Sequence, residues 1–254
     1  MPPAQKVDAA QICATIDANV AKFSARGDSR KATWARKIYR VDDVKAIAEI
    51  LAAGQLLSRA RWLASGPTHA DTGNREIVAD SVHAHRFARL YFRPATPMQF
   101  ANEGIRRAAD ILSGGAHVPV PVFLVFDAKA MLSRQAARFT AGNLAAGPPP
   151  PVICSTALEF ARLPFDEIYH DESTTPLNRG VIRFHRHAEI LYEEQVDLAD
   201  LAEVVCRTEP ERKTLLTFLS GRERELRDLI RVERPGELMF YRRDRTYVEE
   251  VSLA

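Results

Sequence analysis

The sequence lacks most of the features that identify common classes of protein. Its three cysteines, Cys13, Cys154 and Cys206, are far apart and show no paired spacing of the kind that binds metals. We expect them to be free or buried thiols in a reducing compartment. No apolar run approaches the length of a membrane span, and the N-terminus lacks the apolar core of a signal peptide. These absences favour a cytoplasmic protein.

Several catalytic signatures are missing too. There is no Gly-rich phosphate loop, no HExxH metal motif and no nucleophile elbow, and we expect no metal cofactor. The formal net charge is only +2, so overall charge does not by itself indicate a nucleic-acid-binding protein. The arginines nevertheless gather in two stretches, 179–186 and 222–245. Glu and Arg alternate over 222–234, which is typical of the solvated face of a helix.

The composition, 46% hydrophobic and 27% charged over 254 residues, is that of a globular protein. An apolar stripe formed by Ile12, Ile16, Val20 and Phe23 predicts an amphipathic helix over 8–23. We interpret 1–33 as an N-terminal helical extension and 34–254 as the main domain.

Short strands and helices alternate along the main domain, which predicts an α+β fold. Asp42 or Asp43 is placed to cap a helix that ends at Gly54. The stretch 58–86 is rich in Gly, Ser, Thr, Asp and His, and a loop of that length in a compact domain is usually functional or disordered. Strands are expected at 37–41, 89–92, 118–126, 181–187 and 202–207, and further helices from the turn at 94–97 to about Leu112 and around Leu215–Leu219.

One stretch, V-I-R-F-H-R-H-A-E-I-L-Y (181–192), carries an unusual density of groups that hold charge or a proton. Alternation of apolar residues through its first half predicts a strand. A regular strand would place Arg183, His185, His187 and Glu189 on one side and Arg186 on the other. Composition alone is compatible with an edge strand protected by charges and with a carboxylate held among positive groups for chemistry.

Three patches, taken in order, carry a resemblance to a known family. They are I-Y-R-V-D-D-V-K-A-I-A-E-I-L (38–51), A-R-L-Y-F-R-P-A-T-P-M (88–98) and H-A-E-I-L (187–191), followed by F-Y-R-R-D-R-T-Y near the C-terminus. The sequence resembles the DarT-type ADP-ribosyltransferase toxins over about residues 36–248. The resemblance implies a split β-sandwich with flanking helices. It also implies transfer of ADP-ribose from NAD, as co-substrate, to a base in single-stranded DNA, with release of nicotinamide.

The resemblance makes Glu189 the catalytic glutamate. Cleavage of the nicotinamide–ribose bond builds positive charge on the ribose, which a nearby carboxylate stabilises. Arg75, in G-N-R-E, matches the catalytic loop arginine of the family, with Arg61 and Arg86 as alternatives. Because a guanidinium is a poor general base, we assign this arginine to charge stabilisation and positioning.

The first-strand patch implies that Tyr39, Arg40 and Asp42 bind NAD. Arg40 stands where the family usually has histidine, and this departure leaves the modified base open. A guanidinium suits the pyrophosphate because it binds two oxygens at once, although Arg40 could simply be a charge at a strand end. Of the neighbouring aromatics Tyr91 and Phe92, only one can face the nicotinamide pocket, and we choose Tyr91.

The nucleic-acid side is assigned to Arg183, Arg186 and His185, which would bind phosphates while bases are splayed toward the site. The family further implies a toxin of a toxin–antitoxin or phage-defence system, neutralised by a macrodomain hydrolase. The same chemistry on RNA or protein remains an alternative. So does a non-catalytic NAD- or nucleic-acid-binding module, or an interaction protein that uses 222–245.

Overall fold

The computed structural model describes residues 3–67, 69, 71–111, 114–147, 149–219 and 221–241. Its centre is a seven-stranded sheet, antiparallel except for its last pair, with a separate two-stranded sheet beside it. In sheet order the large sheet contains β5 (Arg138–Thr140), β6 (Glu189–Glu193), β3 (Phe87–Tyr91), β1 (Lys37–Asp43), β4 (Pro121–Asp127), β8 (Leu201–Cys206) and β9 (Ile230–Val232). The small sheet pairs β2 (Gln55–Leu57) with β7 (Gln195–Asp197).

The pairing between β1 and β3 is the shortest in the large sheet. β1 pairs with β4 along its whole length, but it meets β3 in register only at Tyr39 opposite Tyr91. No other pair of residues joins β1 and β3 in register within the described ranges. The sheet therefore consists of two parts, β5-β6-β3 and β1-β4-β8-β9, which confirms the expected α+β split arrangement.

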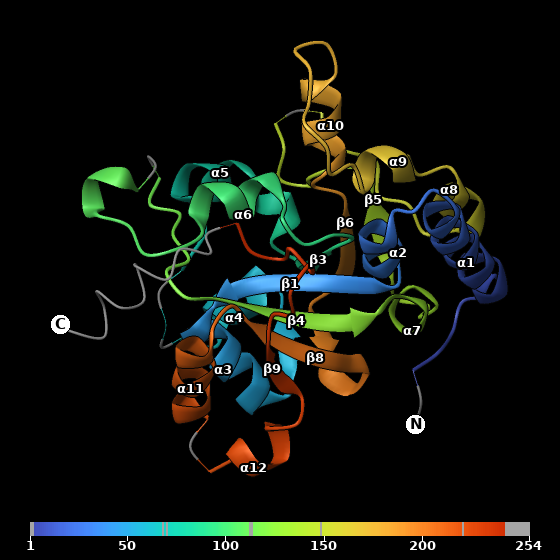
Figure 1. The fold of residues 1–254 in the computed structure, drawn as a ribbon. Coiled ribbons are helices and arrows are strands. Elements are labelled where there is room, and N and C mark those ends of the chain that lie inside the picture. The colour runs from blue at the N-terminus through green and yellow to red at the C-terminus, as the bar shows by residue number, and fades with distance from the viewer. Residues whose placement is uncertain are drawn as a thin grey trace.

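Helices cover both faces and both ends of the sheet (Figure 1). The N-terminal group, α1 (Ala9–Ala25) and α2 (Ser29–Ala35), packs with α7 (Ala128–Leu132) and α8 (Ala157–Ala161), and α3 (Val44–Ala53) packs with α11 (Glu209–Phe218). The remaining short helices are α4 (Arg59–Ala64), α5 (Arg75–Asp80), α6 (Pro97–Asn102), α9 (Phe165–Ile168), α10 (Arg179–His185) and α12 (Glu223–Leu226). Three single 3-10 turns, η1 (Val82–Ala84), η2 (Ala108–Asp110) and η3 (Leu198–Asp200), complete the described elements.

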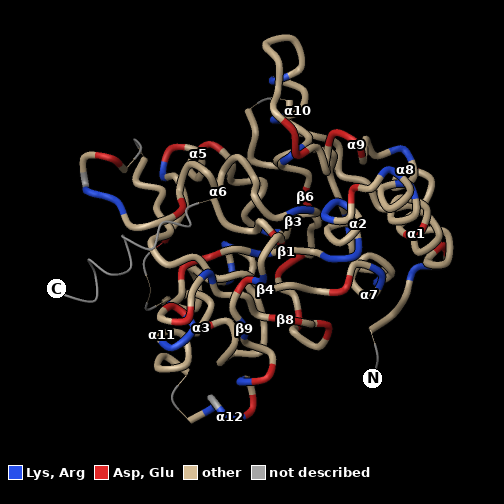
Figure 2. The backbone as a smooth tube through the Cα atoms, in the orientation of Figure 1, with Lys and Arg blue, Asp and Glu red and all other residues tan. Residues whose placement is uncertain are grey.

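The N-terminal helix is part of the main core. Its stripe residues Ile12, Ile16, Val20 and Phe23 are buried in the same hydrophobic cluster as the strands. Basic and acidic positions are interspersed along the backbone of the described elements (Figure 2). Within the described ranges, no helix has the length and apolar character needed to cross a membrane.

Most of the local predictions are confirmed where a capping residue or a long apolar run fixes the element. Asp43 caps α3 by accepting from the Lys45 N–H, and Gly54 ends that helix in the left-handed conformation, φ 70°. Asp127 caps α7 in the same way as Asp43 caps α3. The apolar run at 118–126 forms β4, which is buried from Pro121 to Phe126.

Three predictions are wrong. The helix after the 94–97 turn ends at Asn102 because Glu103 is extended and Gly104 has φ 90°. The stretch 58–86 holds short helices rather than a continuous loop. The stretch 181–187 is not a strand, since α10 runs to His185 and β6 begins only at Glu189. Its brief alternation also fits a helical turn, in which Ile182 is the buried residue.

Candidate active site

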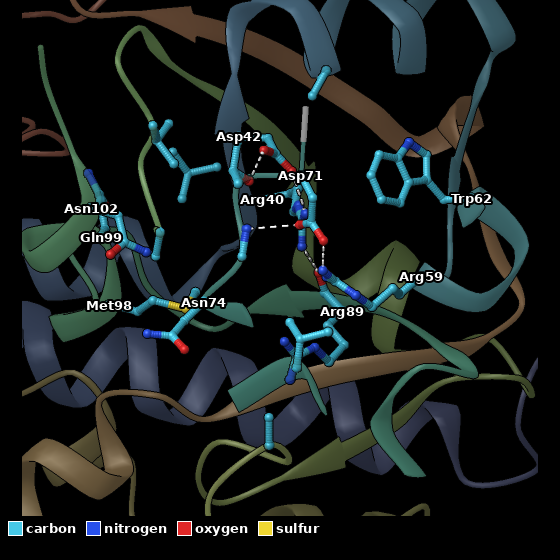
Figure 3. Close-up of a pocket in the computed structure, with 18 of the residues that line it drawn as sticks. Arg40, Asp42, Arg59, Trp62, Asp71, Asn74, Arg89, Met98, Gln99 and Asn102 are labelled. Atoms are coloured by element: carbon cyan, nitrogen blue, oxygen red, sulfur yellow. Dashed lines mark hydrogen bonds and ion pairs between the residues drawn. The ribbon is translucent and has the colours of Figure 1, made fainter. Parts of the chain in front are cut away.

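A pocket of about 520 Å³ opens where β1 and β3 diverge. Its volume lies in the range of small-molecule sites. One side carries charged groups and the other carries amides and apolar side chains, as Figure 3 shows. The first side carries Arg40, Asp42, Arg59, Trp62, Asp71 and Arg89, and the second carries Met98, Gln99 and Asn102. Tyr91 and Val118 also line the pocket.

Arg40 and Asp42, both on β1, form a buried ion pair at the pocket wall. Arg40 Nη2 lies 2.5 Å from Asp42 Oδ2, and the Thr72 hydroxyl donates to Asp42 Oδ1 at 2.8 Å. Burial acts to raise the pKa of Asp42, but Arg40 and Thr72 outweigh it and the pKa is lowered. Both groups are therefore charged at neutral pH.

Two further arginines point toward the same space. Arg59, the first residue of α4, forms an ion pair with Asp71, and Arg89 lies on β3. Burial lowers the pKa of Arg59, and the neighbouring charges of Arg89 and Arg40 lower it further. The Nε atoms of Arg40 and Arg59 are buried and have no hydrogen-bond acceptor within the described part of the chain. Three guanidinium groups thus meet two carboxylates, Asp42 and Asp71, and the cluster keeps a net positive charge.

Glu189 lies directly behind this wall, at the start of β6. Its side chain is 0% exposed, and it sits opposite Tyr91 of β3 and Thr140 of β5. The Leu144 N–H donates to Oε2 at 2.8 Å, and Arg89 Nη1 lies 3.4 Å from Oε1. Burial raises the pKa of Glu189, while Arg89, the Leu144 N–H and Arg40 act in the opposite direction. Oε1 has no hydrogen-bond partner among the residues described.

The aromatic residues divide between the pocket and the core. Tyr91 lines the pocket, and burial together with Glu189 raises its pKa to about 12. Tyr39 and Phe92 are buried in the hydrophobic core, where the Tyr39 ring meets Phe123 edge-on at 6.2 Å. The structure therefore places Tyr91 at the pocket and Tyr39 away from it.

The arginines predicted for catalysis do not line the pocket. Arg75 is exposed at the start of α5, where its N–H donates to the Gly114 carbonyl. Arg61 is exposed and lies 3.6 Å from Glu194, and Arg86 stacks over the Phe87 ring. Arg59, to which the sequence reasoning gave no role, lines the pocket.

The basic residues before Glu189 face three directions because they lie on and just after a helix. Arg183 and His187, one helical turn apart, both line the pocket. His185 binds the Ala141 carbonyl through Nδ1 at 2.7 Å. Arg186 donates from Nε to the His170 carbonyl at 2.9 Å and from Nη2 to the Glu172 carbonyl at 2.8 Å. The prediction that Arg183 and His185 share one side of a strand, with Arg186 on the other side, is therefore wrong.

The sequence reasoning assigned no site role to Arg59, Arg89 or His187. The sequence near Arg59 offers one clue to its position. Ser58 caps α4 by accepting a hydrogen bond from the Arg61 N–H, and it therefore fixes Arg59 as the first residue of that helix. Arg89 stands inside the A-R-L-Y-F patch, but nothing local shows that it contacts Glu189. Over the described ranges, no group of three or more His, Cys, Asp or Glu is placed to hold a metal ion.

Known structures share this fold. DarT of Thermus sp. 2.9 in complex with ADP-ribosylated ssDNA superposes with a TM-score of 0.62 at 18% identity, covering 81% of this chain and 96% of that one. The same protein in complex with NAD+ gives a TM-score of 0.57, also at 18% identity, with 81% and 98% coverage. Thermosipho africanus DarTG in complex with ADP-ribose gives 0.60 at 16% identity, with 81% and 51% coverage. A search of curated proteins returned no match.

The family comparison agrees with the fold and confirms the resemblance inferred from the sequence. The model of the family described as "ssDNA thymidine ADP-ribosyltransferase, DarT" matches residues 39–241. This range contains β1 from Tyr39 on, the strand β3, the helix α10 and Glu189. The chain belongs to the DarT family of NAD-dependent ADP-ribosyltransferases, which modify single-stranded DNA.

Proposed function

We propose that this pocket binds NAD and that the protein transfers ADP-ribose to thymine in single-stranded DNA. The observation that carries the proposal is the position of Glu189. It is a fully buried carboxylate behind a cation-lined pocket, at the point where the sheet splits. The base is taken from the description of the matching family.

The charged side of the pocket suits the pyrophosphate of NAD. Arg40 and Arg59 contribute guanidinium groups whose Nε atoms have no acceptor within the described part of the chain. A guanidinium binds phosphate oxygens through two parallel hydrogen bonds, which positions the ligand as well as holding it. Asp42 keeps Arg40 oriented, and Tyr91 offers an aromatic surface for the nicotinamide ring. The role of Arg75 stays a prediction.

Glu189 is assigned to the ribose. As the bond from ribose C1′ to the nicotinamide nitrogen breaks, its electron pair leaves with nicotinamide and C1′ becomes positively charged. A carboxylate near the sugar stabilises that charge. In DNA the thymine ring nitrogen that carries a proton is N3, so the N3–C1′ bond forms as the N3–H bond breaks, and the proton passes to the Glu189 carboxylate or to water. Arg89, which lines the pocket, lies 3.4 Å from this carboxylate.

The DNA side is assigned to α10 at the pocket mouth. Arg183 lines the pocket, is exposed, and forms no ion pair with a residue that the structure describes. Exposed apolar side chains stand beside it on the same segment, with Leu177 97% and Val181 55% exposed. A cation next to apolar surface suits a strand whose phosphates and unstacked bases are bound together.

The proposal is tested with purified protein, NAD and four DNA homopolymers, followed by intact-mass measurement. We expect oligo-dT to gain ADP-ribose and nicotinamide to be released in equal amount, while the other homopolymers stay unmodified. An adduct on another base would overturn the assignment to thymine, and an adduct on oligo-U but not on oligo-dT would favour RNA. No adduct on any nucleic acid would contradict the proposal.

An enzyme that modifies single-stranded DNA is expected to be harmful to the cell that makes it. We therefore propose that the protein is the toxin of a toxin–antitoxin pair and that a macrodomain hydrolase which removes ADP-ribose neutralises it. Co-expression is expected to restore growth only if the macrodomain keeps its hydrolase activity. A cytoplasmic location stays a prediction.

A further inference from the structure

The N-terminal helices contact one acidic segment through a series of ion pairs. Lys22 of α1 and Arg26, just after the end of that helix, lie 2.5 Å and 2.9 Å from the two carboxylate oxygens of Asp166. On α2, Arg30 pairs with Asp171 and Lys31 pairs with Glu172. Four basic residues from one part of the chain thus meet three acidic residues that lie about 140 positions later in the sequence. Figures 1 and 2 show these helices beside α9 and below α10.

These charges are not needed to bury α1. The apolar stripe of that helix already packs in the core through Ile12, Ile16, Val20 and Phe23. The side chain of Arg26 is 54% exposed. The basic residues therefore serve a contact that is separate from core packing.

The same acidic segment is held from its other side by residues of the main domain. Arg93 donates to the carbonyls of Ile168 and His170 while stacking on Trp34 of α2 at 4.7 Å. Arg186, at the end of α10, donates to the carbonyls of His170 and Glu172. The segment 166–172 is therefore fixed between the N-terminal helices and the end of α10.

The helix α10 contacts both the pocket and the loop 141–144, which binds Glu189. Its outer residue Arg183 lines the pocket. On its inner side the Phe184 ring sits so close to Gly142 that a Cβ there would lie 2.3 Å from it, and His185 binds the Ala141 carbonyl. Leu144, two residues beyond Gly142, donates to Glu189.

We propose that α1 and α2 form a clamp, made by Lys22, Arg26, Arg30 and Lys31 on 166–172, which positions α10 and Arg183 for the DNA strand. The inference rests on the proposed function. It assigns a role to a part of the chain that lies outside the family match, which begins at Tyr39. These residues position the site and do not touch the reacting atoms.

The pair Lys31–Glu172 offers the clearest test because both charges can be exchanged. We expect Lys31→Glu and Glu172→Lys each to raise KM for an oligo-dT substrate about three- to fivefold at low salt. KM for NAD should stay unchanged, and the double variant K31E/E172K should restore the wild-type value. The matched control is Asp17→Lys, which breaks an ion pair between α1 and Lys129 of α7, away from the clamp, with the same charge change as E172K.

The two single variants separate positioning from overall charge. K31E removes positive charge and E172K adds it, so a bulk effect on DNA binding would move KM in opposite directions. Opposite shifts, an equal rise in KM for NAD, or a failure of the double variant to recover would each overturn the clamp.

Hydrogen exchange provides a readout that does not require activity. We expect the amides of 170–187 to exchange faster in both single variants, and at the wild-type rate in K31E/E172K and in Asp17→Lys. Unchanged exchange in the single variants would overturn the clamp even if the enzyme is active. A protein that gives no adduct but shows this exchange pattern would retain the clamp and refute only the proposed function.

Discussion

Nη1 of Arg89 lies 3.4 Å from Oε1 of Glu189, a carboxylate whose side chain is 0% exposed. Arg89 itself is 24% exposed and lines the pocket. The positive charge of Arg89, on the pocket wall, therefore interacts directly with the carboxylate of Glu189. Anything that binds Arg89 from the pocket changes the surroundings of Glu189.

The first prediction concerns the pH dependence of the reaction. Because burial raises the pKa of Glu189 above 4.5, the acid limb of kcat/KM is expected above that value. Arg89 lowers this pKa, so Arg89→Gln should move the limb to still higher pH. Arg86→Gln, which changes an exposed arginine two residues from the start of the A-R-L-Y-F patch, is the control. Identical limbs in wild type and Arg89→Gln would refute the link.

The second prediction concerns stability. A carboxylate whose pKa is raised on folding contributes stability when protonated, below its ordinary pKa, and this contribution is lost as pH rises through the folded-state pKa. Glu189→Gln should therefore raise Tm at neutral pH by a few degrees, since about 1 kcal/mol corresponds to roughly 2–4 °C at this chain length. The difference should vanish in acid. A lower Tm for the variant at neutral pH would show that ionised Glu189 stabilises the fold.

The third prediction decides between two arginines. Arg59→Gln should raise KM for NAD about tenfold, since a charged hydrogen bond contributes about 1.5–3 kcal/mol. Arg75→Gln is the matched comparison, because Arg75 begins α5 at the surface as Arg59 begins α4 at the pocket. Steady-state kinetics with NAD varied at saturating oligo-dT make the measurement. A larger effect from Arg75→Gln would return the role to the residue predicted from the sequence.

The fourth prediction separates two neighbouring arginines on the DNA side. Arg183→Gln should weaken oligonucleotide binding and reduce the slope of log K against log salt by about one, as loss of one phosphate contact does. Arg186→Gln should instead lower Tm, because its guanidinium holds the His170 and Glu172 carbonyls. Fluorescence anisotropy at several salt concentrations and thermal melting distinguish them. Equal salt slopes for wild type and Arg183→Gln would contradict the assignment.

The sequence predicts those parts of the fold that local chemistry decides. Asp43 and Gly54 mark the two ends of α3 because a cap and a left-handed residue act within one turn. The strand predicted at 181–187 is wrong because an alternation of apolar residues over so few positions fits a strand and a helical turn equally well. Only the packing of Ile182 decides between them.

The sequence predicts the part of the candidate site that is formed by motif residues on β1 and β3. Arg40, Asp42 and Tyr91 meet at the pocket as expected, since β1 and β3 carry them there. Arg59 and Arg89 could not be predicted, because their proximity depends on how the sheet splits. The clamp could not be predicted either, because Lys31 and Glu172 are distant in the sequence and meet only in the folded chain.

The central claim is that Glu189 carries the transfer of ADP-ribose to thymine. It is tested most directly by tandem mass spectrometry of a mixed-sequence oligonucleotide treated with NAD and wild type, Glu189→Gln or Glu193→Gln. Glu193 is the matched control, since it is exposed at the far end of the same strand. We predict ADP-ribose on thymine with wild type and Glu193→Gln, and a rate at least about a hundredfold lower with Glu189→Gln. Equal modification by Glu189→Gln and wild type would contradict the account.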